Sequence, residues 1–148
     1  MTLDAGALLL QTVPFARTLG VTFDHTGDGR AVCRLADRPD LHNHVAGPHA
    51  GALFTLAESA SGAAMLSALG DQLARAVPLT TGATVQYHKL AKGDVVAEGR
   101  LLASREDVLA ELDAGRRPEF DVAVEIRNGE DVPVCSFTFT WTLRPNRT

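Results

Sequence analysis

Cysteine is scarce in this sequence: Cys33 and Cys135 are the only two in 148 residues, and no CxxC spacing occurs. Both lie in strand-like runs far apart in the chain, which favours two small buried hydrophobic side chains in a reducing compartment over a disulfide framework. Basic residues are in no excess either, because the formal net charge is −4 at pH 7. The sequence therefore offers no general positive field for nucleic acid, and any bound phosphate needs a local cationic patch.

No targeting segment is expected either. The N-terminal region carries Asp4 in place of a basic stretch, and its apolar run, ALLL, is too short for a secretory signal. Residues 49–70 are long enough to span a membrane, but glycines, hydroxyl side chains and Glu58 interrupt them. We expect this run to be a buried helix of a soluble, cytoplasmic protein without a membrane partner.

The remaining sequence has the alternation of half-buried strands. A chain of this length can bury about 70% of the surface that its unfolded form exposes, which favours a single domain over residues 1–148. Apolar residues alternate with polar ones in several runs, and turn-forming residues separate them. The predicted strands are 19–25, 30–36, 81–89, 93–104, 119–127 and 133–143, and the predicted helices are 3–11, 50–69 and 104–115.

These elements predict an α+β fold. One-sided alternation gives each strand one buried face, whereas the helix over 50–69 is apolar nearly all round and must be buried on several sides. An antiparallel sheet of about five to six strands wrapped around that helix satisfies both demands. Because an open sheet leaves an unpaired edge, pairing with a second copy of the chain is expected.

The most unusual segment is 41–65, LHNHVAGPHAGALFTLAESASGAAM. Three histidines and Asn43 crowd a loop, and Glu58 is the only formal charge between His49 and Gly70. A buried carboxylate is costly unless it has a partner or a function. The three histidines, His42, His44 and His49, suggest a metal site by their spacing but lack a second set of ligands, so we expect neither a metal nor a cofactor.

This segment resembles the active-site segment of hotdog-fold acyl-CoA thioesterases, most closely the phenylacetate-pathway (PaaI-like) type and its uncharacterised relatives. Those proteins have an Asn, a Gly, a His followed by Gly-Gly or a near variant, and an acidic residue nine positions after the His. Here Asn43, Gly47, His49 and Glu58 match, while Ala50 replaces the first Gly and Glu replaces the commoner Asp. The similarity continues through the strands at 83–103 and 121–141, and so covers nearly the whole chain.

The resemblance implies hydrolysis of a thioester whose coenzyme A is part of the substrate. Glu58 would act as general base or nucleophile, and the amides at the start of the helix, near Gly51, would hold the oxyanion. Asn43 and His49 would position the water or the carbonyl. In the family the loop and the helix carboxylate meet across a homodimer interface, so each site would use two chains, and two dimers can pair into a tetramer.

Other residues are candidates for contact with the substrate. Phe54 and Gly62 share a helical stripe with Glu58, and Gly62 leaves room beside the carboxylate. The further candidates are Gly47 and Ala50 in the loop, Thr80 and Thr81 at the start of the long strand, and Lys89, with Lys92, for the phosphates of coenzyme A.

Two other functions remain open at this point. A non-catalytic acyl-CoA binder or regulator is favoured by Ala50 and by the small residues that crowd Glu58. A hydratase or dehydratase of the same fold is less favoured, because the family's hydratases place the acid closer to the loop glycine than the seven positions from Gly51 to Glu58.

Overall fold

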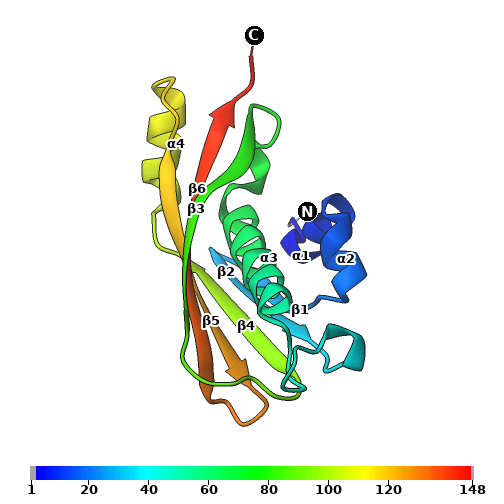
Figure 1. Ribbon diagram of the computed structural model, residues 1–148. Helices are drawn as coiled ribbons and strands as arrows, with labels where there is room; N and C mark the ends of the chain where they lie inside the picture. The colour runs from blue at the N-terminus through cyan, green and yellow to red at the C-terminus, as the bar shows by residue number, and fades with distance from the viewer. Residues whose placement is uncertain (1–2, 148) are drawn as a thin grey trace.

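The computed structural model describes residues 3–147. Residues 1, 2 and 148 of the predicted domain therefore lie outside the described part of the chain. Within it, six antiparallel strands form one sheet in the order β1-β2-β4-β5-β6-β3, which wraps around the helix α3 (Figure 1). The predicted α+β class and hotdog arrangement are confirmed. The strands are β1 (Thr22–Gly27), β2 (Arg30–Leu35), β3 (Ala76–Tyr87), β4 (Val95–Leu101), β5 (Glu119–Asn128) and β6 (Pro133–Pro145).

The central helix α3 (Ala50–Leu69) is buried along most of its length, as predicted. By length and composition it could cross a membrane, but here it is a core helix that the sheet covers. Its small residues let it lie close to β4: a Cβ on Gly99 would lie 2.8 Å from the Ala60 carbonyl oxygen. Gly99 thus permits a contact between helix and strand backbones that any side chain would block.

The core lies between α3 and the inner face of the sheet. Its largest fully buried side chains include Phe139, Leu56, Met65 and Ile126. The two cysteines are buried and free, as predicted, and burial raises the pKa of both thiols, that of Cys135 to about 11. Neither thiol therefore has the thiolate character that reactive cysteines need.

The N-terminal prediction is wrong in its boundaries. Instead of ending a single helix, Pro14 begins a second one, so that α1 (Ala5–Thr12) is followed by α2 (Pro14–Leu19). Proline suits this first helical position, because its missing N–H would have no helical partner there. Leu19, predicted in a strand, consequently ends α2, and β1 starts at Thr22. The two helices pack against α3 on the side away from the sheet (Figure 1).

The long strand β3 starts earlier than predicted, at Ala76, and contains Pro78. Proline is tolerated because β3 is an edge strand, where one row of backbone groups has no partner. A register shift between Thr80 and Gly82 marks a bulge at Thr81. The inner face of β3 is left uncovered, since Thr80, Ala83 and Tyr87 pair with inward residues of β6 and yet are exposed.

The inserted helix is confirmed as α4 (Arg105–Asp113). The Ser104 hydroxyl accepts a hydrogen bond from the Asp107 amide at 3.1 Å, which caps its first turn. Gly115, predicted as the stop, has φ +75°, the left-handed conformation that glycine adopts after a helix. Two short 3-10 turns, at Pro39–Leu41 and Gly70–Gln72, complete the chain.

Candidate functional site

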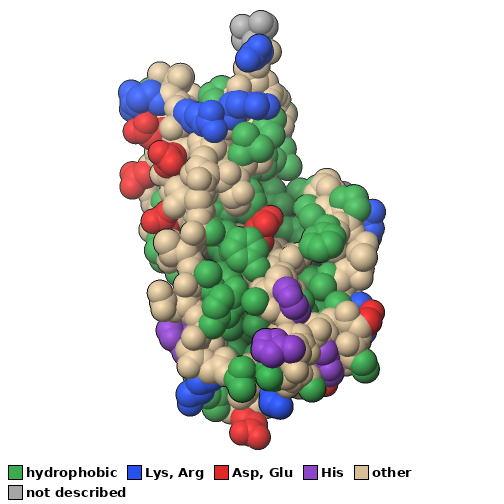
Figure 2. Space-filling model, in the orientation of Figure 1, with side chains coloured by type: hydrophobic (Ala, Val, Ile, Leu, Met, Phe, Trp, Pro, Cys, Tyr) green, Lys and Arg blue, Asp and Glu red, His purple; other side chains and the backbone are tan. Residues whose placement is uncertain are grey.

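Glu58 lies in the middle of α3, between Phe54 one turn before it and Gly62 one turn after it. Among residues 3–147, no hydrogen bond or ion pair engages its carboxylate, and burial alone raises its pKa above the ordinary value. The side chain is half-buried. No fully buried polar side-chain atom in the described chain lacks a partner, so the carboxylate oxygens reach the surface. Figure 2 shows an acidic side chain among hydrophobic ones on the face above α3.

The helix stripe that carries Glu58 faces strand β6. Phe54 packs edge-to-face on Phe139, with ring centroids 5.3 Å apart, and on Phe137 at 5.9 Å. Gly62 lies against the ring of Trp141, which a Cβ would approach to 3.6 Å. Glu58, placed between these two contacts, therefore faces β6 and the uncovered inner face of β3 beyond it.

His49 caps the start of α3. Its Nδ1 accepts a hydrogen bond from the Gly51 amide at 2.8 Å. Because an accepting Nδ1 carries no proton, the proton of a neutral His49 ring is on Nε2. The sequence assigned the Gly51 amide to the oxyanion and His49 to positioning the water or carbonyl; in the structure the Gly51 amide is engaged by His49.

The helix N-terminus borders a hollow. The amides of Ala50 and Ala52 have no hydrogen-bond acceptor among the described residues, as expected for the first turn of a helix. Ala50 is exposed and Ala52 is buried, so of these two amides that of Ala50 is the one at the surface. A cavity of about 480 Å³ adjoins this turn and is lined by His42, His49, Gly51, Thr55 and Phe15, among others.

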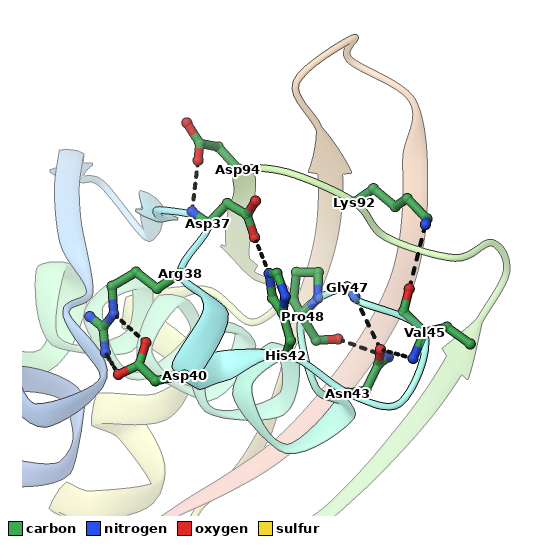
Figure 3. A network of polar contacts seen from close by, with 10 residues as sticks. All are labelled: Asp37, Arg38, Asp40, His42, Asn43, Val45, Gly47, Pro48, Lys92 and Asp94. Atoms are coloured by element: carbon green, nitrogen blue, oxygen red, sulfur yellow. Dashed lines mark hydrogen bonds and ion pairs between the residues drawn. The ribbon is translucent and has the colours of Figure 1, made fainter.

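Asn43 organises the loop that precedes the helix (Figure 3). Its Oδ1 accepts hydrogen bonds from the amides of Val45 and Gly47 at 3.0 and 3.1 Å, and its Nδ2 donates to the Pro48 carbonyl at 3.5 Å. The turn it closes holds Ala46 at φ +58°. The Asn43 side chain, which we predicted to lie beside the substrate, thus makes its hydrogen bonds within its own loop.

The same arrangement occurs at the distant β5–β6 turn. There Asn128 Oδ1 accepts from the amides of Glu130 and Val132, and Asp131 has φ +63°. In both places the asparagine Oδ1 accepts hydrogen bonds from the amides two and four positions ahead. The residue three positions ahead has the left-handed backbone conformation. A side-chain oxygen that replaces a backbone acceptor in this way is a general turn device.

Gly47 is required by packing. It is buried, and a Cβ there would lie 2.4 Å from the Ala91 carbonyl oxygen. Lys92, in the same β3–β4 connection, donates from Nζ to the Val45 carbonyl at 3.4 Å (Figure 3). The structure therefore places Gly47 in the packed contact between two loops. Lys89 is exposed and follows the end of β3 by two residues.

The bulge in β3 separates the two threonines that were predicted together. Thr80 pairs with Trp141 on the inner face of the sheet. The Thr81 hydroxyl instead contacts Glu119 Oε1 at 3.3 Å and the Thr140 carbonyl at 3.4 Å, on the outer face. Only Thr80 shares a face with Glu58.

The histidines do not gather into a metal site. His42 Nε2 lies 2.6 Å from Asp37 Oδ1, and the backbone amide of Asp37 in turn donates to the Asp94 carboxylate (Figure 3). His44 is exposed. Between residues 3 and 147, no group of three or more His, Cys, Asp or Glu side chains is arranged to hold a metal ion. The His42–Asp37 pair was not predicted, since nothing in the sequence spacing indicates it.

A long helix that carries one free carboxylate, enclosed by an antiparallel sheet, defines a hotdog-fold protein of the thioesterase-like class. The sequence model of the family described as a domain of unknown function, DUF4442, matches residues 5–143, and the chain belongs to that family. No protein of curated function matches the sequence significantly.

Solved structures agree with this fold. A Pseudomonas aeruginosa protein of unknown function, described as a probable thioesterase, has a TM-score of 0.83 and 26% identity, over 96% of this chain and 94% of its own. A hypothetical thioesterase from Streptococcus pneumoniae, solved with coenzyme A, has a TM-score of 0.68 and 24% identity, over 87% and 89%. The Escherichia coli PaaI protein, from the phenylacetic acid degradation operon, has a TM-score of 0.74 and 19% identity, over 98% and 93%. The resemblance stated from the sequence is confirmed.

Proposed function

We propose that the protein hydrolyses acyl-CoA thioesters, with Glu58 as the base or nucleophile. The observation that carries the proposal is the half-buried Glu58 carboxylate, which has no partner in the described chain and a pKa raised by burial. A structural carboxylate in a core helix would be expected to have an ion-pair or hydrogen-bond partner. A carboxylate held free with a raised pKa is suited to accept a proton near neutral pH.

The hydrolysis has two possible routes from this residue. As a general base, Glu58 removes a proton from water, the oxygen attacks the carbonyl carbon, and the C–S bond breaks as the coenzyme A sulfur takes a proton. As a nucleophile, Glu58 attacks the carbonyl carbon and expels the coenzyme A thiolate, which takes a proton from water. A water molecule then hydrolyses the mixed anhydride to the free acid and restores the Glu58 carboxylate. Both routes need a donor for the carbonyl oxygen.

The start of α3 supplies that donor. Because the Gly51 amide is bonded to His49 Nδ1, the proposed donors are the His49 Nε2–H and the amide of the exposed Ala50. The positive end of the helix dipole adds to their effect on a developing oxyanion. In this proposal Asn43 and Gly47 act by shaping the loop, Phe54 and Thr80 by lining the thioester, and Lys89 by contacting the coenzyme A phosphates.

A second copy of the chain completes the site in this proposal. The inner face of β3 is exposed at Thr80, Ala83 and Tyr87, and the edge of the strand has unpaired backbone groups. Pairing of two β3 edges would remove both liabilities and bring a second loop towards Glu58. Assembly of two such dimers into a tetramer and a cytoplasmic location remain predictions.

The relatives support the choice of substrate class. The Streptococcus pneumoniae structure contains coenzyme A, and the Pseudomonas aeruginosa protein is described as a probable thioesterase. Neither description says which acyl group is bound. The proposal is therefore limited to thioesters of coenzyme A, without an additional cofactor.

A thiol-release assay tests the proposal. Purified protein is incubated with short, medium, long and aromatic acyl-CoAs, and free thiol is followed with a chromogenic disulfide. We expect turnover with at least one class, and a loss of at least about 10³-fold in Glu58→Gln, which keeps the shape of the side chain but cannot accept the proton. Glu106→Gln, on the exposed face of α4, is the matched control. Unchanged turnover in Glu58→Gln would overturn the proposal.

One observation favours a non-catalytic acyl-CoA binder. The Gly51 amide, which the resemblance assigns to the oxyanion, already donates to His49. In a binder, acyl-CoAs of several classes would bind with measurable affinity but release no thiol. The same panel, followed by calorimetry as well as by thiol release, separates the two functions.

A further inference from the structure

The His42–Asp37 pair lies beside the proposed oxyanion donors, yet the proposed hydrolysis gives it no role. His42 and His49 line the same cavity of about 480 Å³ at the start of α3. An antiparallel bridge between His42 and Pro48 holds the two histidines near one another, because it sets His42 against the residues that lead into the helix. His42 therefore borders the space in which the thioester carbonyl is proposed to lie.

The cavity extends to the turn of α3 beneath Glu58. Thr55 lines the cavity and lies on the same helical stripe as Glu58, three residues before it. Side chains of a helix lean towards its N-terminus, so the Glu58 carboxylate lies over the turn that contains Thr55. In a site shared by two chains, one copy would still supply His42 and His49 together, since both line one cavity of a single chain.

Asp37 holds the His42 ring through one nitrogen. His42 Nε2 lies 2.6 Å from Asp37 Oδ1, and the Asp37 amide donates to the Asp94 carboxylate at 2.7 Å (Figure 3). The His42 side chain is 23% exposed, and no hydrogen bond engages its Nδ1 among residues 3–147. An imidazole that a carboxylate orients through one nitrogen can exchange a proton at the other.

Few charged or titratable groups surround the His42 ring. Asp40 lines the same cavity and is paired with Arg38 at 3.1 Å, and His49 is bonded through its own Nδ1. Asp37 is the group in contact with the ring. Its negative charge complements an imidazolium, in which both ring nitrogens are donors. The His42 Nδ1–H is then available to a ligand while Nε2–H remains bonded to Asp37.

We propose that His42 is the general acid of the hydrolysis and gives its Nδ1 proton to the coenzyme A sulfur, with Asp37 as its positioning residue. The inference rests on the proposed function in its general-base route, in which the sulfur takes a proton as the C–S bond breaks. The oxyanion donor His49 holds the oxygen of the same carbonyl carbon that carries the sulfur. A donor in the cavity beside His49 is therefore close to the leaving group.

The proposed step balances without a further reactant. Water loses a proton to Glu58, and its oxygen bonds to the carbonyl carbon. The electron pair of the C–S bond then goes to the sulfur, which takes the proton from His42 Nδ1. Glu58 returns its proton to His42 through solvent. The products are the free acid and coenzyme A, and both side chains regain their starting states.

The test compares leaving groups that differ in their need for a proton. One acyl group is esterified to coenzyme A and to a nitro-substituted thiophenol, whose thiolate leaves without a proton. His42→Gln should lower kcat for the coenzyme A ester at least about 10²-fold, and for the aryl ester less than about threefold. Asp37→Asn should show the same selective loss at a smaller size. Glu58→Gln should slow both esters alike.

His44→Gln is the matched control, because His44 is exposed two positions further along the loop and does not line the cavity. It should leave both rates unchanged. His42→Gln should fold, since glutamine keeps an N–H donor for Asp37, and circular dichroism checks this. A His42→Gln loss that is equal for the two esters, or no loss at all, would overturn the general acid.

The pH profile of the coenzyme A ester decides the question without the aryl ester. The wild-type kcat should fall at alkaline pH as the proton donor is lost, and this limb should be absent from His42→Gln. A wild-type profile that stays level to about pH 9, or an alkaline limb retained in His42→Gln, overturns the role of His42 while the hydrolysis stands. Absence of thiol release from every acyl-CoA overturns the proposed function, and the general acid with it.

Discussion

The Glu58 carboxylate is held in surroundings that disfavour its charge. Burial raises its pKa, so between its unfolded and folded pKa values the native state binds more protons than the unfolded state. The free energy of unfolding then falls as pH rises through that window, and the whole decrease is present above the folded pKa. The free energy lost there is the cost of keeping a base without a partner.

Glu58→Gln is therefore expected to raise stability at neutral pH while it abolishes turnover. The gain should be on the order of 1 kcal/mol, or about 2–4 °C in Tm for a chain of this size. It should shrink as pH falls below the ordinary glutamate pKa, because both states of the wild type are then protonated. Thermal unfolding of both proteins between pH 4 and pH 8 measures this difference. A variant that is less stable than the wild type at pH 7 would contradict a partnerless carboxylate.

The same shift predicts the pH dependence of hydrolysis. Glu58 must be ionised to act as base or nucleophile, so kcat/KM should rise with pH through the raised pKa of the folded protein. The acid limb should accordingly lie above the pH at which an exposed glutamate titrates. A pH profile of kcat/KM for one good substrate, with unfolding followed in parallel, shows where the limb falls. An acid limb at or below the ordinary glutamate pKa would exclude Glu58 as the titrating group.

Asn43 matches the family pattern, and its side chain stabilises the loop before α3. Its acceptor oxygen, not its amide N–H, makes the two shorter bonds, as at Asn128. Asn43→Asp keeps that oxygen and should keep most of the turnover. Asn43→Ala should lose both turnover and about 1–2 kcal/mol of stability, because two amides lose their acceptor.

The β5–β6 turn provides the control for this prediction. Asn128→Ala should lose similar stability in chemical denaturation yet retain thiol release, since its turn contributes no residue to the proposed site. If Asn43→Asp folds normally but is inactive, the amide N–H of Asn43 contacts the substrate and the loop interpretation is wrong.

At the scale of the element, α3 combines a structural cap and a proposed donor in one side chain. His49 Nδ1 caps the helix through the Gly51 amide, which leaves Nε2–H for the thioester oxygen. Asparagine is also a good N-cap, so His49→Asn should keep the stability within about 0.5 kcal/mol, whereas His49→Ala should lose about 1 kcal/mol. Both variants lack Nε2–H and should lose about 10²–10³-fold in kcat.

Denaturation and thiol release measured on both His49 variants distinguish the two roles. A fully active His49→Asn would mean that the histidine is a cap alone and that the helix amides hold the oxyanion without it. An inactive but stable His49→Asn supports the donor role.

Local patterns predicted the elements that depend on few distant contacts. The apolar run of α3, the alternation of β5 and β6 and the Ser104 cap of α4 are visible in the sequence because each depends on its own neighbours. The spacing from His49 to Glu58 placed both on α3 for the same reason. Their roles as cap and partnerless carboxylate required the structure.

Other features depend on packing that no short segment encodes. Pro78 is compatible with a strand only because β3 is at the sheet edge, which is a property of strand order. The bulge that separates Thr80 from Thr81 follows from pairing with β6. Gly47 matches a family position, but glycine is required there because the Ala91 carbonyl, in a loop more than forty residues away, leaves no room for a Cβ. The packing of α1 on α3, through buried residues such as Leu9, depends on contacts between segments more than forty residues apart.

At the scale of the whole molecule, the single chain leaves the inner face of its edge strand β3 without a cover. Phe54 and the rest of α3 shield β6, but β3 extends beyond them with Thr80, Ala83 and Tyr87 exposed. A long edge strand with exposed apolar residues is a liability for a monomer. We therefore expect the chain to exist in solution as a dimer joined through β3.

Ala83→Arg tests this expectation at the centre of the strand. A charged, bulky side chain on the inner face opposite Phe139 should be tolerated in a free monomer, because the position is exposed, but not in a packed dimer interface. We expect light scattering to report half the wild-type mass, and thiol release to fall together with the mass because the proposed site uses two chains. Ala110→Arg, equally exposed on α4, should change neither. A dimeric Ala83→Arg protein would move the interface away from β3, and a monomeric but fully active one would confine the whole site to a single chain.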